Sequence, residues 1–499
     1  MPPIVRAFRH RNYRLFFAGQ LISLVGTWMQ MVAESWLVFR LTGSSALLGL
    51  SAFAGQIPVF LFAPIGGAVA DRFNRHRIIV VTQSVSMVLP LILAALTLSG
   101  RVRVWHVFVL AMSLGIVNAF DIPARQAFVV DMVGRDDLLN AIALNSSMVN
   151  GARILGPSVA GLTVAAVGEG WCFLINGVSY LAVIAGLLMM RVPRTARQPA
   201  RRSALHDTIE GFRFVARTAP VRALLVLLGI ISFAGMPYSV LMPVFAESIL
   251  HAGPEGLGVL MGASGAGALA GTLALASRSG VRGLGRWVLM AATAFGVSLI
   301  LFSLSRTFWL SAVLLVPVGA SMMVQMASSN TLIQAMVPDA LRGRVMAVYS
   351  MMFVGMAPFG SLFAGFVAER IGAPRTLALG GAVCLVAAAV FATRRTRRRR
   401  SRSTGRRHPP DDRLRVPDER SAHRVERPVT ARCTVLSRGG AHSRAATCRV
   451  SGIPCPYGEL RAERAGGASG RVYTINITST DSAGNSSSST VFVTVPNNR

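Results

Sequence analysis

The chain has 499 residues, of which 52% are hydrophobic and only 14% are charged, and its formal net charge is +30. Soluble domains carry roughly a quarter of charged residues, so this composition excludes an ordinary soluble globular protein. The positive charge alone would suggest a nucleic-acid partner, but in residues 1–393 the arginines gather in short clusters between apolar runs, which is typical of cytoplasmic membrane loops and argues against nucleic-acid binding there.

Apolar runs long enough to cross a bilayer recur between residues 15 and 393. A helix needs about 20 apolar residues to cross the hydrocarbon, and on this measure the sequence predicts about twelve spans. We therefore expect an all-α membrane protein with two pseudo-symmetric six-helix halves. The predicted spans lie near residues 15–38, 45–70, 78–99, 104–123, 139–166, 171–190, 221–248, 256–276, 287–305, 308–333, 345–367 and 375–393.

Arginines are frequent in alternate loops and sparse in the others, and the positive-inside rule then places both termini in the cytoplasm. The predicted domains are an N-terminal half at 1–190, a cytoplasmic linker at 191–220, a C-terminal half at 221–393 and a tail at 394–499. Within the linker, Leu205, Ile209, Phe212 and Val215 predict one face of a short amphipathic helix on the membrane surface.

Glu34 lies inside the first span, where an ionisable side chain costs about 2.5–3.5 kcal/mol on insertion scales and so needs a partner or a function. Arg153, in the fifth span, lies at a depth that two long side chains can bridge. We hypothesise that Glu34 and Arg153 interact in one conformational state. The alternative is that Glu34 reaches the outer headgroups alone.

The loop between the second and third spans reads GGAVADRFNRHR over residues 66–77. As an anion at a helix end, Asp71 is able to cap a facing helix N-terminus and to pair with arginine. The loop resembles the signature loop of the major facilitator superfamily, G-x-x-x-D-R-x-G-R-R. The matching residues are Gly67, Asp71, Arg72 and Arg75.

Asn74 stands where the superfamily loop has its second glycine. That glycine usually supplies a positive φ, and asparagine is the residue that tolerates this conformation next best. The resemblance implies that the loop is a cytoplasmic latch between the halves, closed in one state and open in the other.

Other stretches resemble bacterial exporters of the enterobactin-exporter and macrolide-efflux branch of this superfamily. They are residues 26–30, 36–44, 118–126, 140–141 and 152–161. The resemblance covers residues 5–393 and implies a monomeric secondary exporter that is driven by protons and holds no cofactor. It does not identify the substrate.

Asp121 and Arg125 lie four residues apart near the cytoplasmic end of the fourth span, with Pro123 expected to interrupt the helix between them. We expect a structural salt bridge that holds the inner gate, with proton carriage as the alternative. In the fifth span, the run from Gly156 and Pro157 to Gly161 resembles the antiporter motif that is associated with export.

The tail divides into two parts. Residues 394–470 are rich in arginine, proline and serine without an apolar period, which predicts disorder. Residues 472–477 and 490–495 alternate as strands do and predict a hairpin-like fragment. Two strands alone make no stable sandwich, so we expect no independent function from it.

These features together predict an exporter of small lipophilic molecules, of the drug or siderophore type, in the bacterial inner membrane. It would work by alternating access and exchange its substrate for protons. A lysophospholipid flippase, or a membrane anchor or sensor that presents its tail, are the alternatives. No nucleotide-binding loop, nucleophile–base arrangement or metal-ligand cluster was found in the sequence, so neither an enzyme nor a metal site is expected.

Overall fold

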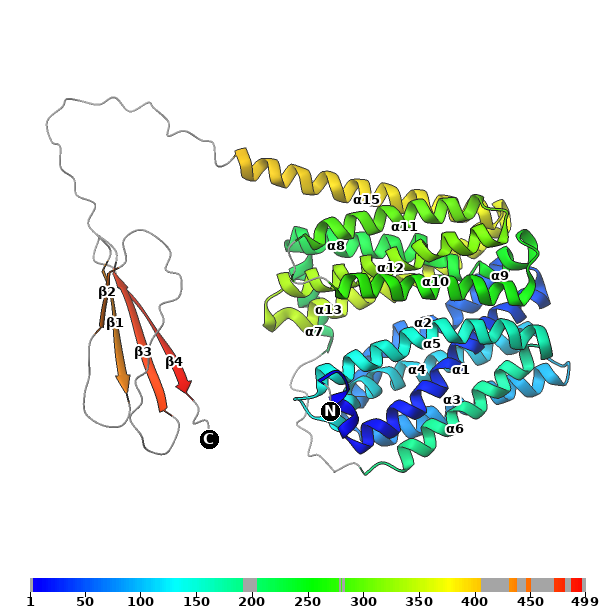
Figure 1. Ribbon diagram of the computed structural model, residues 1–499, viewed down its shortest axis with the longest axis horizontal. Coiled ribbons are helices and arrows are strands. Elements are labelled where there is room, and N and C mark those ends of the chain that lie inside the picture. Colours follow the sequence, from blue (N-terminus) through cyan, green and yellow to red (C-terminus); the bar gives the residue numbers. More distant parts are fainter. Residues whose placement is uncertain are drawn as a thin grey trace. The chain divides into compact units, whose positions relative to one another are not determined.

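The computed structural model describes residues 3–191, 204–277, 280, 283–404, 430–437, 446–449, 471–480 and 486–495. The chain divides into a helical unit, Met1–Arg407, and a second unit, His408–Arg499, that contains strands. Figure 1 shows the helices of the first unit as two bundles that lie side by side.

The first bundle consists of six long helices preceded by a short 3₁₀ helix (Figure 1). Gly43, with φ 61°, ends the first of them in the left-handed conformation, and the Ser44 side chain caps the next by accepting a hydrogen bond from the backbone N of Leu47. The elements are η1 (Pro3–Arg9), α1 (Arg11–Thr42), α2 (Ser45–Arg72), α3 (Arg75–Leu98), α4 (Val104–Val133), α5 (Leu138–Val167) and α6 (Glu169–Leu188).

The second bundle follows the linker helix α7 (Ala204–Arg217) and opens with an irregular span. Pro237 and Pro243 lack the backbone N–H that a regular helix requires, and the span passes through π and 3₁₀ turns. That span is α8 (Ala219–Ile230), η2 (Ile231–Gly235), η3 (Met236–Ser239), α9 (Met242–Val244) and η4 (Phe245–Ile249). The remaining helices are α10 (Gly253–Ala276), α11 (Leu284–Leu304), α12 (Phe308–Met336), α13 (Asp339–Phe353), α14 (Met356–Ile371) and α15 (Ala373–Thr404).

Eleven helical segments of the described residues are long and apolar enough to cross a membrane. The other predicted span is α5, which is 30 residues long and packs within the first bundle. Its polar residues, among them Asn150 and Arg153, lower its hydropathy below that of the others. The predicted multi-span helical membrane fold is therefore confirmed.

Two helix boundaries differ from the prediction. The fourth span was expected to end near residue 123, but α4 continues through Pro123 to Val133. A proline removes one hydrogen bond, and here the surrounding helices hold the remaining turns in place. The eleventh span was expected to be one helix, but it is divided into α13 and α14 at Val354 and Gly355.

The predicted linker helix exists as α7, and of the two described residues of its predicted face one is buried and the other is exposed. Phe212 is 40% exposed, whereas Val215 is 8% exposed and joins the core. A Cβ atom on Gly211 would lie 2.7 Å from the backbone oxygen of Arg344, and the Arg344 and Glu210 side chains form an ion pair. The helix therefore packs on α13 through its glycine side. Leu205 and Ile209 lie outside the residues whose side chains are described.

In the second unit, the predicted hairpin is present as β3 (Arg471–Thr480) and β4 (Ser486–Val495), which pair antiparallel. Within residues 394–470 the structure describes the end of a helix and two strands. Helix α15 continues to Thr404, and two further strands, β1 (Thr430–Ser437) and β2 (Ala446–Arg449), complete a sheet of order β2-β1-β3-β4. Strand β1 pairs antiparallel with β3, with Arg432 opposite Thr478 and Ser437 opposite Tyr473.

Candidate functional site

The helical unit has two ends, which are named here by residues that lie at them. The Gly43 end carries the turn between α1 and α2. The linker end carries η1 and α7, which lie at the same end of the bundles (Figure 1). Contacts between the bundles join α2 to α14 and α5 to α10.

The two bundles meet backbone to backbone near the Gly43 end. A Cβ atom on Gly161 of α5 would lie 2.9 Å from the Pro254 oxygen and 3.0 Å from the Gly258 Cα of α10. A Cβ atom on Gly49 of α2 would lie 3.0 Å from the Gly365 Cα of α14. These two glycine pairs, Gly161–Gly258 and Gly49–Gly365, are called the seam below.

A carboxylate adds a polar contact to the seam. Glu369 of α14 accepts hydrogen bonds of 3.1 Å from the Ser44 hydroxyl and from the backbone N of Ala46, at the start of α2. A carboxylate at a helix N-terminus satisfies unpaired N–H groups and interacts favourably with the helix dipole. Sequence reasoning missed Glu369, because the pattern gives no sign that α14 ends beside α2.

The antiporter-like motif of α5 contributes to this contact. Gly156 faces α1 within the first bundle, where its Cβ atom would lie 3.0 Å from the Val25 oxygen. At the next residue, the Pro157 oxygen lies 2.7 Å from the Cβ position of Gly258. The motif therefore places Gly156 against its own bundle, and Pro157 and Gly161 against the opposite bundle.

The signature loop lies at the linker end. Arg75 forms ion pairs with Asp131 at 3.2 Å and with Asp71 at 3.7 Å, and it donates to the Ala127 oxygen at 3.1 Å. The Asp71 side chain is 54% exposed. Arg72 is exposed, and a Cβ atom on Gly67 would meet no atom within 4 Å. The loop is thus held within its own bundle by Arg75, and Asp71 is accessible.

The left-handed conformation expected at Asn74 is wrong. Its φ is −69°, and it is the N-cap of α3, where its side chain accepts a hydrogen bond of 3.3 Å from the backbone N of Arg77. Asparagine is a strong N-cap residue because its side-chain oxygen satisfies a free N–H in the first turn. This local capping, rather than tolerance of a positive φ, accounts for the residue here.

Glu34 and Arg153 are held by different partners. Half-buried Glu34 lies within hydrogen-bond range of Gln30 and Ser51, and Gln30 accepts a hydrogen bond of 2.5 Å from Asn176. The Arg153 guanidinium lies 5.7 Å from the centre of the Trp28 ring, a cation–π contact. Within the described residues, Glu34 and Arg153 form no ion pair in this conformation.

Asp121 and Arg125 form the ion pair that the sequence predicts, at 3.1 Å, on an uninterrupted helix. The Asp121 side chain is only 2% exposed, and it accepts hydrogen bonds from Thr82 at 2.8 Å and Gln83 at 3.0 Å. Arg125 also donates to Gln20 of α1 at 3.2 Å. The pair therefore joins α1, α3 and α4, and the expectation that Pro123 would break this helix was wrong.

A second buried carboxylate, Asp137, fastens the N-terminal segment to the turn before α5. Its side chain is 1% exposed and contacts Arg6 at 3.3 Å, Arg9 at 2.7 Å and His10 at 2.9 Å. The hydrogen bond with His10 and the nearby arginines hold the pKa of Asp137 below its usual range. Sequence reasoning missed this cluster, because its members lie more than a hundred residues apart.

We expect Asp137→Asn to lower the melting temperature at pH 7. An aspartate whose folded pKa is depressed stabilises the fold above its unfolded pKa, near 3.9. This stabilisation is lost as the pH falls through the lower folded pKa. The difference in melting temperature between wild type and variant should therefore shrink below about pH 4. Exposed Asp136→Asn is the matched control, and an equal loss in both variants would contradict the assignment.

No group of three or more metal-binding side chains occurs in the described part of the chain. Several of the described ionisable residues within the first bundle instead form ion pairs, among them Asp121 with Arg125 and Glu169 with Arg40.

The chain is similar to known membrane transporters. The family model described as transmembrane secretion effector matches residues 4–422. The staphyloferrin A transporter of Staphylococcus aureus is 25% identical, over 77% of this chain and 96% of its own. The multidrug efflux pump Tap of Mycolicibacterium fortuitum is 27% identical, over 72% and 89%. The enterobactin exporter EntS of Shigella boydii is 24% identical, over 68% and 81%.

Among solved structures, the nucleoside transporter NupG matches with a TM-score of 0.61 at 14% identity. The match covers 79% of this chain and 99% of that structure. At this identity the likeness shows the fold alone. The superfamily and the exporter branch predicted from sequence are both confirmed.

Proposed function

Because the chain belongs to the transmembrane secretion effector family of the major facilitator superfamily, we propose that this membrane transporter exports small lipophilic molecules by alternating access. The observation that carries the proposal is the seam. The bundles meet at backbone distance near the Gly43 end, while Asp71, the residue expected to latch the linker end, is exposed.

The proposed direction of transport follows from the distribution of arginines between the loops. Their distribution predicts that the linker end faces the cytoplasm, and a bundle pair closed at the Gly43 end would then be ready to accept a cytoplasmic substrate. The relatives are transporters or exporters of siderophores and a drug efflux pump, which supports the same two substrate classes for this chain. Export would then need the seam to open and the linker end to close.

Proton entry is the proposed source of energy. A charge that falls through 100 mV yields about 2.3 kcal/mol. Glu34 is the proposed carrier, since it lies among polar side chains that can satisfy both of its protonation states. In the opposite conformation we propose that Arg153 leaves Trp28 and pairs with the ionised Glu34. Opposite-charge pairing would then stabilise the deprotonated form in that state alone.

The test is a substrate panel of macrolides, lipophilic dyes and iron-free siderophores on everted vesicles, with and without a proton gradient. The proposal expects uptake of at least one compound, accelerated by an inward acidic gradient. If every compound is taken up at a rate that does not depend on the proton gradient, the proposal of proton antiport is wrong. No uptake of any compound would count against these substrate classes.

We expect Glu34→Gln to reduce gradient-driven uptake by about tenfold, since glutamine has the shape of the protonated side chain but cannot release or take up a proton. Exchange of labelled for unlabelled substrate, which needs no gradient, should continue. Glu169→Gln is the matched control, because Glu169 pairs with Arg40 at 2.6 Å at the Gly43 end and is assigned no coupling role. A normal gradient response in Glu34→Gln would show that another group carries the proton.

The anchor or sensor alternative predicts that function resides in the second unit. Deletion of residues 408–499 should leave substrate uptake within about twofold of wild type if the chain is an exporter, because Met1–Arg407 is a compact unit by its own contacts. Uptake and membrane insertion would be measured together in vesicles. Normal insertion with abolished uptake would favour a role for the tail.

A further inference from the structure

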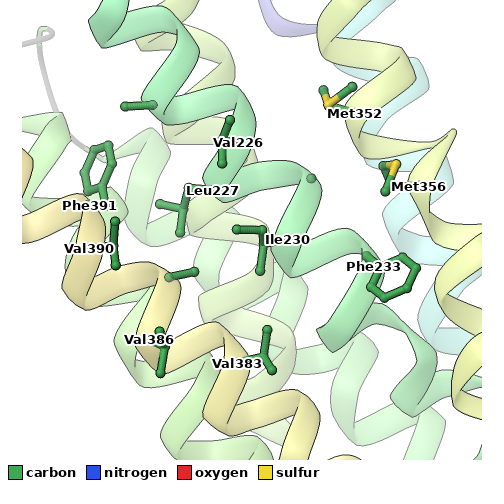
Figure 2. A pocket seen from close by; sticks show the side chains of 13 residues that line it. Val226, Leu227, Ile230, Phe233, Met352, Met356, Val383, Val386, Val390 and Phe391 are labelled. Atoms are coloured by element: carbon green, nitrogen blue, oxygen red, sulfur yellow. The ribbon is translucent and has the colours of Figure 1, made fainter. Parts of the chain in front are cut away.

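A groove of about 670 Å³ lies on the second bundle between α8, α15 and the junction of α13 with α14. Figure 2 shows Leu227 and Ile230 of α8 on the side of α15, where Val386 and Val390 lie. Met352 and Met356 lie across α8 from α15 in this view. Every lining side chain is apolar, and Val226, Val386 and Val390 are 47%, 64% and 45% exposed. The volume is within the roughly 300–1,000 Å³ of small-molecule sites.

The groove exists because α8 and α15 touch at one level and separate at another. The close contact is at η2, which continues α8. There Gly380 of α15 lies against the Ala234 carbonyl, and the groove opens from this point toward the linker end. In the first bundle, the corresponding helices α1 and α6 stay close together at the linker end. A Cβ atom on Gly186 of α6, at the linker end, would lie 2.9 Å from the Leu15 oxygen of α1. The groove therefore distinguishes the second bundle from the first.

The length of the groove matches one leaflet. Its lining on α8 and η2 runs from Ala223 to Phe233, which is about 15 Å at 1.5 Å per residue. The hydrocarbon core of a bilayer is about 30 Å thick, so the groove covers half of it. One acyl chain of a lipid in the leaflet at the linker end fits this length and this purely apolar wall.

The end of the groove that is nearest the linker end, called its mouth here, lies beside arginine positions of α8 and α15. Helix α15 continues without interruption to Thr404. Arg394 and Arg395 follow Phe391 by three and four residues, so these positions extend the face of α15 that lines the groove. On α8, exposed Arg222 comes directly before Ala223. Guanidinium groups pair with phosphate in a bidentate manner, so the mouth suits an anionic headgroup.

We propose that this groove is a binding site for one anionic membrane phospholipid. One acyl chain lies between α8 and α15, and the headgroup phosphate lies at Arg222 of α8, at the level of positions 394 and 395 on α15. The lipid would also touch Met352 and Met356, and beside them Gly355 packs on Phe60 of the first bundle. A bound lipid therefore contacts the segment through which α13 and α14 adjoin the other half.

The test is native mass spectrometry of the full, delipidated chain, titrated with phosphatidylglycerol or with phosphatidylcholine of the same acyl chains. We expect wild type to bind the first phosphatidylglycerol at least tenfold more tightly than phosphatidylcholine. Val386→Trp, which fills the groove, should weaken that first site at least tenfold. Val178→Trp is the matched control on α6, where Val178 is 51% exposed, and it should change the affinity less than twofold. The double variant Arg394→Gln/Arg395→Gln should abolish the preference for the anionic lipid.

Equal affinity for the two lipids, or equal effects of Val386→Trp and Val178→Trp, would overturn the proposal and leave only annular lipid. Displacement of phosphatidylglycerol by a transported compound would assign the groove to substrate instead. The measurement needs no transport, so it stands or fails separately from the proposed function. An unchanged melting temperature of Val386→Trp shows that the variant is folded.

Discussion

Gly161→Val is expected to reduce substrate transport at least tenfold. The added Cβ atom would lie 2.9 Å from the Pro254 oxygen and 3.0 Å from the Gly258 Cα, both of which are backbone atoms of the opposite bundle that cannot rotate away. The bundles must then separate at the Gly43 end. The variant should fold, because the clash exists only while the seam is closed, and it should remain in the conformation with that end open.

The matched control is Gly151→Val on the same helix, where a Cβ atom would meet nothing within 4 Å. Accessibility gives a second measurement. Ser361 is 3% exposed beside Gly49, and a cysteine there should become reactive when Gly161→Val is present. The five native cysteines would be replaced first. Full transport by Gly161→Val would show that transport does not need the closed seam. An unreactive cysteine at position 361 would show that the substitution does not open it.

Asp121→Ala is expected to destabilise the protein by roughly 3 kcal/mol, the lower end of the range for breaking a buried pair, since Arg125 is 28% exposed. The change also leaves Thr82 and Gln83 without their shared acceptor. Thermal unfolding in detergent measures the loss. By contrast, Asp131→Asn removes a partly exposed pair with Arg75 and should cost less than about 1 kcal/mol.

The double variant Asp121→Asn/Arg125→Gln separates the two roles considered for this pair. It removes both charges and keeps groups that can hydrogen-bond. If the pair is structural, most of the stability should return and gradient-driven uptake should persist. Loss of the gradient response in a stable double variant would instead assign proton carriage to Asp121. The coupling energy follows from the two single variants and the double one.

The sequence predicted the features that depend on local pattern. Apolar length fixed the spans, and the signature loop at residues 66–77 identified the superfamily. The spacing of Asp121 and Arg125 predicted their ion pair, because residues four apart face each other on a helix. Pro123 misled the prediction, since a proline inside a packed helix need not end it.

Features that depend on contacts between distant segments were not predictable. Glu369 caps a helix that begins more than three hundred residues earlier, and Asp137 gathers partners from the N-terminus. No periodicity encodes such partners. The groove between α8 and α15 also could not be predicted. Its valines resemble those of any lipid-facing helix, and the groove arises only because the two helices diverge.

The seam consists of glycines, and this has a consequence for how the bundles meet and part. Ordering a long side chain costs up to about 2 kcal/mol of rotamer entropy, and glycine has none to lose. At Gly161–Gly258 and Gly49–Gly365 the backbones touch with no side chain between them. Closing the contact at these four glycines therefore freezes no rotamers. The side chains that must part when the bundles separate lie beside the glycines, at Glu369 and where Phe359 packs on Phe53 and Phe60. The glycines still bring the bundles together in a single register, because only a glycine opposite a glycine allows so close an approach.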